Sequence, residues 1–205
     1  TWIPDTNISG DITGVLPGAG HEIVWDYSAI YTENVPDVIV RLITEDLAIS
    51  PPSDPFDIIN TEITKPLVDP QLFYVVINYD LLAAPGVPRD LFLEFSVDGG
   101  ATWTQSTAIS GDVSSVLPGT SLTMTWMTSQ VFSGNEDMVY VRLYSDDGAI
   151  SPISDPMDII NTRIGVPEAA AEYGLVTITY DLEGLAGALY DLALQYSTDG
   201  GLSWI

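Results

Sequence analysis

The sequence predicts an all-β fold, built as tandem β-sandwiches of about 101 residues each. The first observation is an internal repeat without gaps. Trp2 and Trp103 occupy equivalent positions, and later matching residues keep the same offset of 101 residues. The second is the alternation of apolar and polar residues in short runs, which is the period of a half-buried strand. The third is the presence of Pro and Gly between these runs, which favours turns over helices.

The repeat extends through the whole chain with unchanged spacing. Four landmarks show this best: Ser9-Gly10-Asp11 with Ser110-Gly111-Asp112, Val15-Leu16-Pro17-Gly18 with Val116-Leu117-Pro118-Gly119, Trp25 with Trp126, and Asp98-Gly99-Gly100 with Asp199-Gly200-Gly201. A period of this length is that of a whole domain, and it is too long for one unit of a solenoid. The chain therefore reads as part of a tandem array.

The apolar runs place about seven strands in each repeat. Leu122, Met124 and Trp126, for example, alternate with threonines on the opposite face. Strands are expected near residues 63–70, 72–81, 90–97, 101–107, 121–128, 137–145 and 150–161. This number of strands is typical of an immunoglobulin-like or fibronectin type III-like sandwich.

With the first strand of a domain placed near residue 63, the chain divides into one whole domain and two incomplete ones. Residues 63–163 form the complete sandwich, residues 1–62 the C-terminal part of another, and residues 164–205 the N-terminal part of a third. Each part has open strand edges, which invite pairing with another chain. Because the two parts are complementary, one hypothesis is that they join between chains and give a head-to-tail fibre. The alternative is that both belong to a longer covalent array.

Composition narrows the classes of partner. The chain has 29 acidic and 5 basic residues and a net charge of −24, so it repels nucleic acid and anionic membranes and suits divalent cations. No apolar run reaches the roughly 20 residues of a membrane span, so membrane insertion is not expected. The absence of cysteine excludes disulfides and zinc–thiolate sites. The start does not resemble a signal peptide, which suggests a mature or excised segment.

Catalysis is not expected. The single histidine, His21, aligns with Leu122 in the other copy, and no cysteine is present. Few residues are therefore suited to form a catalytic nucleophile–base pair. Carboxylate pairs are plentiful, but an acidic surface produces them by chance. The sequence indicates a protein that is not an enzyme and requires no cofactor.

Calcium is the one ion for which the sequence offers candidate ligands. Asp98 and Asn161 are expected at the exit end of one sandwich, and Asp181 and Asp191 at the entry end of the next. Oxygen ligands that converge at such a junction would suit Ca²⁺ and would stiffen the array. The competing interpretation is structural, because Asp98-Gly99-Gly100 has the composition of a tight hairpin turn.

One segment has a known counterpart. Ser96–Trp103 resembles the Asp-box hairpin, and Ser197–Trp204 resembles it with Ser203 in place of threonine. The whole repeat is similar to the immunoglobulin-like or fibronectin type III-like modules that occur in tandem in bacterial and archaeal surface proteins. The resemblance implies sandwich architecture and an extracellular or cell-surface location. It implies neither a propeller fold nor glycosidase activity, because the hairpin occurs only once per repeat.

Three functions follow as hypotheses. The first is a structural repeat unit of an extracellular filament, sheath or stalk, whose partner is a further copy of itself. The second is a spacer region of a cell-surface adhesin. The third is an accessory carbohydrate-binding module of a secreted enzyme, in which Trp2, Trp103 and Trp204 would form a sugar platform if they were exposed.

Overall fold

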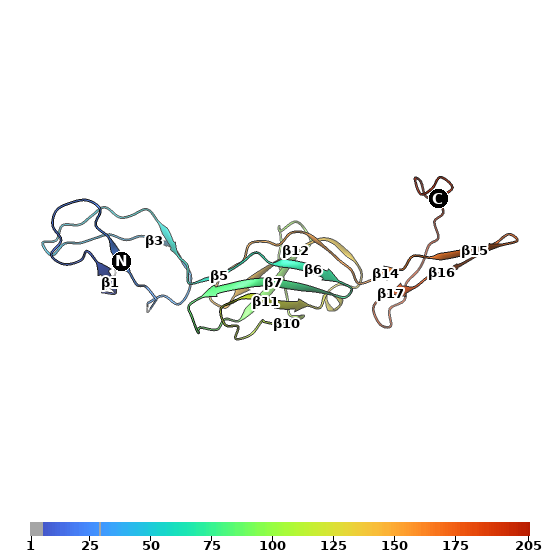
Figure 1. The fold of residues 1–205 in the computed structure, drawn as a ribbon, viewed down its shortest axis with the longest axis horizontal. Coiled ribbons are helices and arrows are strands. Elements are labelled where there is room, and N and C mark those ends of the chain that lie inside the picture. The colour runs from blue at the N-terminus through green and yellow to red at the C-terminus, as the bar shows by residue number, and fades with distance from the viewer. Residues whose placement is uncertain (1–5, 29) are drawn as a thin grey trace.

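The computed structural model describes residues 6–28 and 30–205 (Figure 1). The described chain is all-β, as predicted, and its one helical element is the 3₁₀ turn η1 (Thr128–Gln130). Figure 1 shows three bodies along one long axis. A two-sheet body, the central unit (residues 61–162), lies between an N-terminal segment (residues 6–60) and a C-terminal segment (residues 163–205).

The central unit consists of two antiparallel sheets. The first has the order β10-β11-β7-β5, with β6 also on β7; its strands are β5 (Thr61–Ile63), β6 (Leu67–Gln71), β7 (Tyr74–Ala83), β10 (Ile109–Gly111) and β11 (Gly119–Trp126). The second has the order β13-β12-β8-β9; its strands are β8 (Leu91–Ser96), β9 (Thr104–Ser106), β12 (Glu136–Ser145) and β13 (Met157–Ile159).

The strand β10 (Ile109–Gly111) was not expected from the sequence, and two expected strands differ in extent, each for a chemical reason. The first expected strand is split into β5 and β6 on either side of Pro66, which has no N–H to donate to the ladder. The last expected strand shortens to β13. Before it, the hydroxyls of Ser151 and Ser154 accept hydrogen bonds from the N–H groups of Leu143 and Val141, in place of backbone carbonyls.

The core lies between the two sheets. Alternate residues of β7 are buried, and Ile77 is fully buried in one apolar cluster with Leu93 and Leu143 of the second sheet. Trp126 is also fully buried, with its ring centroid 5.2 Å from that of Phe95, and its Nε1 donates to Ser106 Oγ at 2.9 Å. One continuous apolar layer therefore stabilises the central unit.

The N-terminal segment contains four short strands in two pairs: β1 (Ile8–Gly10) with β2 (Ile23–Trp25), and β3 (Val35–Val38) with β4 (Phe56–Ile58). The Ile8–Trp25 pair lies 101 residues before the Ile109–Trp126 pair of β10 and β11. Gly10 explains part of the repeated motif. Its φ is +95°, and a Cβ there would lie 2.5 Å from the Glu22 carbonyl oxygen.

The C-terminal segment contains the counterparts of the first strands of the central unit. β14 (Arg163–Ile164) pairs with β17 (Leu182–Glu183), and β15 (Glu168–Glu172) pairs with β16 (Leu175–Thr179). Both pairings keep the register of β5, β6 and β7 after a shift of 101 residues. Residues 192–196, which correspond to β8, form no strand within the described chain.

Candidate functional site: exposed half-cores and their junctions

The outer segments expose the residues that form the core of the central unit. Leu93 is 0% exposed, but its counterpart Leu194 in the C-terminal segment is 71% exposed. Leu143 is 0% exposed, whereas Leu42 in the N-terminal segment is 58% exposed. Other core counterparts are also exposed to solvent: Val15, Val40, Val176, Tyr180, Leu192 and Tyr196. Many exposed apolar side chains in one segment are typical of an interaction site.

The reason is that each segment lacks the strands that would cover it. In the central unit, β7 is flanked by β11, and β8 by β12. Within the described residues, the C-terminal segment has strands that correspond to β5, β6 and β7 and the residues that correspond to β8, but none that correspond to β11 or β12. The described part of the N-terminal segment has the counterparts of β10 to β13 and no residues that correspond to β7 or β8. Together, the two segments contain residues that correspond to β5–β8 and β10–β13.

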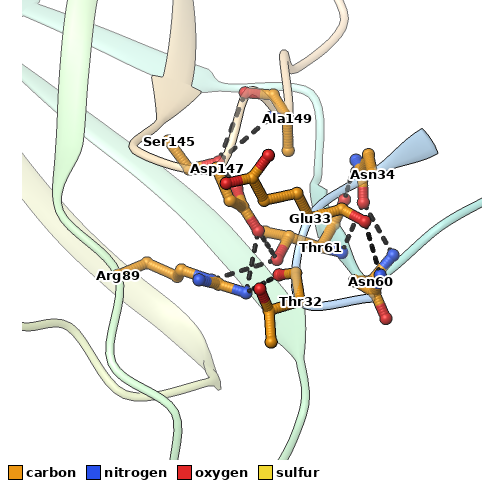
Figure 2. Close-up of polar contacts among 9 residues, drawn as sticks. All are labelled: Thr32, Glu33, Asn34, Asn60, Thr61, Arg89, Ser145, Asp147 and Ala149. Atoms are coloured by element: carbon orange, nitrogen blue, oxygen red, sulfur yellow. Dashed lines mark hydrogen bonds and ion pairs between the residues drawn. The ribbon is translucent and has the colours of Figure 1, made fainter. Parts of the chain in front are cut away.

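A buried polar cluster joins the N-terminal segment to the central unit (Figure 2). Arg89 Nη2 lies 2.8 Å from Asp147 Oδ2 and donates to the Thr32 carbonyl oxygen at 2.9 Å. Thr61 Oγ1 donates to Asp147 Oδ2 and accepts from Arg89 Nε at 3.2 Å. Ser145 Oγ donates to the other carboxylate oxygen of Asp147. The Arg89–Thr32 bond holds the N-terminal segment against the central unit, and the other contacts, all within the central unit, hold Arg89 in place.

An asparagine clamp holds the chain where it enters the central unit. Asn34 Oδ1 accepts from the N–H groups of Asn60 and Thr61, at 2.6 and 2.9 Å. Asn135 makes the same pair of contacts with Asn161 and Thr162 at the other end, both at 2.8 Å. The clamp therefore recurs with the period of the sequence.

We expect Asp147→Ala to destabilise the chain by about 3–5 kcal/mol, because it leaves the Arg89 charge buried without its counter-ion. Urea unfolding followed by circular dichroism measures the change. Asp146→Ala is the matched control: Asp146 is the exposed neighbour, and its removal is expected to change stability by less than about 0.5 kcal/mol. Equal effects of the two substitutions would contradict this role of the ion pair.

Asp98, the first of the four calcium candidates, is engaged within its own hairpin. Its carboxylate accepts hydrogen bonds from Thr102 Oγ1 at 2.6 Å, Thr102 N at 2.9 Å and Ser96 Oγ at 2.7 Å. These bonds, from Thr102 first and then Ser96, lower the pKa of Asp98 from 3.8 to about 2. Asp199 makes the same contacts with Ser203 and Ser197, and its pKa is also lowered.

The other three candidates lie apart from Asp98 in their contacts. Asn161 is fully buried, and its Nδ2 donates to the carbonyl oxygens of Phe132 and Gly134 at 3.0 and 3.1 Å. Asp181 and Asp191 are exposed in the C-terminal segment. Among the described residues, no three His, Asp or Glu side chains group as a metal site would require. The calcium junction stays a prediction.

The lowered pKa of Asp98 gives a pH dependence with a definite sign. A carboxylate whose folded pKa lies below its unfolded value stabilises the fold above the unfolded pKa, and this contribution is lost as pH falls through the folded pKa. The stability gap between the wild type and Asp98→Asn should therefore be constant down to about pH 5 and close towards about pH 2. Urea midpoints measured across this range test it, and a gap independent of pH would contradict it.

The hairpin tryptophans differ in their surroundings. Trp103 is half-buried, its Nε1 donates to the Gly100 carbonyl oxygen at 3.1 Å, and the Arg142 guanidinium lies 4.3 Å from its ring centroid. Arg142 also pairs with Glu94 at 2.7 Å. Trp204 is exposed, and Trp2 lies outside the described residues. One face of the Trp103 ring is thus occupied by a cation, which leaves less of it for a sugar.

Sequence reasoning missed the two polar clusters. Asn34 and Asn135 recur at the repeat spacing, and this could have identified the clamp. The Arg89–Asp147 pair does not recur, because Tyr190 stands at the position that corresponds to Arg89. One signal was available: an arginine among the few basic residues of an acidic chain is a candidate for a buried ion pair.

Comparison with known proteins leaves this geometry as the only guide to function. No family model, no curated protein and no solved structure matches the chain. Within residues 6–28 and 30–205, no helix has the length and apolar character needed to cross a bilayer.

Proposed function

We propose that this chain is a structural repeat unit of an extracellular filament, sheath or stalk, built of immunoglobulin-like or fibronectin type III-like sandwiches that assemble head to tail. The observation that supports the proposal is the pair of outer segments, whose exposed apolar residues correspond at the 101-residue spacing to complementary parts of the central core. The partner is a second copy of the chain. Its N-terminal segment covers the C-terminal segment of the first copy, and together they complete a sandwich.

The central unit provides the template for this contact. Its Met124–Ile77 and Leu143–Leu93 pairs correspond, after the shift of 101 residues, to Ile23 with Ile178 and Leu42 with Leu194. Every one of these pairs is apolar, so the strand register that buries the central core would also bury the composite core. Burial of each such side chain contributes roughly 1.5–3 kcal/mol.

Polar groups of the two segments are complementary as well. In the central unit, Asp80 Oδ1 accepts from Ser121 N at 2.8 Å, and Asp90 Oδ1 accepts from Ser115 N at 2.8 Å. The counterparts of the two aspartates are Asp181 and Asp191, in the C-terminal segment. The counterparts of the two donors lie at residues 20 and 14, in the N-terminal segment. The two calcium candidates thus have structural hydrogen bonds available in the completed sandwich.

The arrangement of the three bodies favours open growth. The two outer segments lie at opposite ends of the central unit, so one chain cannot bring its own halves together (Figure 1). A heterologous contact of this kind extends into a fibre. A longer chain in which the repeat continues would supply the same segment covalently, and the result would again be an elongated row of sandwiches.

Electron microscopy of the purified chain tests the proposal. We expect long fibres that persist in the presence of a chelator, and growth that is faster at about 0.15 M salt than at about 0.01 M, because salt screens the repulsion between acidic segments. Fibres that dissociate in chelator would still support head-to-tail assembly and would also support the calcium prediction. Isolated monomers at every concentration and salt would overturn the proposal, and a covalent spacer would then be favoured.

A further inference from the structure

The contact between the N-terminal segment and the central unit is the first junction, and the contact at the other end of the central unit, around Asn161 and Thr162, is the second. The second junction involves a hydroxyl that has no partner within the described part of one chain. Thr162 Oγ1 is buried and has no hydrogen-bond partner among the described residues. Its counterpart at the first junction, Thr61 Oγ1, donates to Asp147 and accepts from Arg89. A buried hydroxyl without a partner is costly, so the arrangement around Thr162 is incomplete as it stands.

The missing acceptor is present elsewhere in the sequence. The counterpart of Asp147 is Asp46, which lies in the N-terminal segment and is exposed. Thr44 Oγ1 donates to Asp46 Oδ1, just as Ser145 Oγ donates to Asp147 Oδ1. Asp46 is thus held in the same local turn as Asp147, without the threonine and arginine that Asp147 contacts.

Resting on the proposed head-to-tail assembly, we infer that Thr162 of one copy donates to Asp46 of a second copy, and that this bond seals the second type of junction in the fibre. The composite sandwich would bring the Asp46 turn next to the Asn161-Thr162 linker, as the central unit brings the Asp147 turn next to Asn60-Thr61. Junctions of two kinds then alternate along the fibre.

The two junctions differ in the residue that faces the aspartate: the first has the cationic Arg89, and the second has none. Tyr190 occupies the position of Arg89, so the second junction has the carboxylate and the hydroxyl but no guanidinium. Within one chain, the Tyr190 hydroxyl accepts from Leu185 N at 2.9 Å. The second junction is therefore the weaker one, and an arginine at position 190 of the first copy would face Asp46 of the second.

Tyr190→Arg tests the inference by a gain of assembly. We expect the critical concentration for fibre formation to fall by about tenfold or more, as close charge pairs across interfaces provide. Asp46→Asn in the same chain should abolish the gain, whereas Glu45→Gln, which removes the adjacent exposed carboxylate, should keep it. Tyr190→Met controls for loss of the phenol and should not tighten assembly.

Thr162→Val provides the complementary loss. It replaces the hydroxyl with a methyl group, so it should raise the critical concentration where Asp46 is intact and have no effect in the Asp46→Asn background. Two results would overturn the inference while the proposed assembly stands. One is a critical concentration that Thr162→Val does not change, and the other is a decrease caused by Tyr190→Arg that is equally large in the Asp46→Asn chain. If the wild-type chain forms no fibres at all, the proposed function fails, and the inference fails with it.

Discussion

Substitution of Leu194 by aspartate is expected to abolish fibre growth. The side chain is exposed in the isolated chain, so the change should leave the central unit folded, whereas in the composite core it would bury a charge without a partner. Leu42→Asp should do the same from the other half. A 1:1 mixture of the two variants should stop at two chains, because each keeps one intact half. Analytical ultracentrifugation measures all three results.

Leu189→Asp is the matched control for this experiment. Leu189 is also highly exposed, but its counterpart in the central unit, Pro88, stays exposed, so this position should remain in solvent after assembly. Fibre formation by the Leu189→Asp variant should equal that of the wild type. Unimpaired growth by the Leu194→Asp variant, or a mixture that grows beyond two chains, would contradict completion of one sandwich by two halves.

Trp126→Ala is expected to destabilise the central unit by about 3–5 kcal/mol, since it removes a fully buried ring and leaves a cavity. Trp25 is the counterpart in the N-terminal segment, where it contacts Tyr27 and Tyr31 edge to face, with ring centroids 5.9 and 6.2 Å apart. Trp25→Ala should leave the unfolding of the central unit unchanged. In fibres, however, it should weaken assembly strongly, because Trp25 then takes the buried position of Trp126.

Urea unfolding of both variants, measured in the assembly-deficient Leu194→Asp background, separates these effects. Circular dichroism is the suitable signal, because the substitutions alter tryptophan fluorescence directly. The fibre-forming background then gives the effect on assembly. A large loss of central-unit stability in the Trp25→Ala chain would mean that the N-terminal segment already forms part of that core, contrary to the structure.

The sequence was sufficient to predict an all-β chain and most strand positions, because alternation of apolar residues decides which face is buried. It could not predict that Ser151 and Ser154 replace backbone carbonyls beside β12, since a serine hydroxyl shows no preference until its neighbours are placed. Pro66 was visible in the sequence, yet its effect on the first strand depended on which neighbour that strand pairs with.

The candidate site shows a similar division. The complementarity of the outer halves follows from the phase of the repeat, which the sequence displays directly. The junction does not, because the Arg89–Asp147 contact joins residues 58 positions apart across two loops, and neither loop has a periodic pattern. The aspartates proposed as calcium ligands are typical of turns, and Asp98 is bonded to its own hairpin.

Cysteine cross-linking tests the central claim most directly, since the chain has no cysteine of its own. The Thr125–Val76 pair of the central unit corresponds to Val24 and Thr177, on facing strands of two copies. Mild oxidation of the Val24→Cys/Thr177→Cys chain should give a ladder of covalent oligomers, because paired residues lie within disulfide reach. Absence of the ladder, or an equal ladder from the Val24→Cys/Ile178→Cys chain, whose cysteines point to opposite faces, would contradict the account.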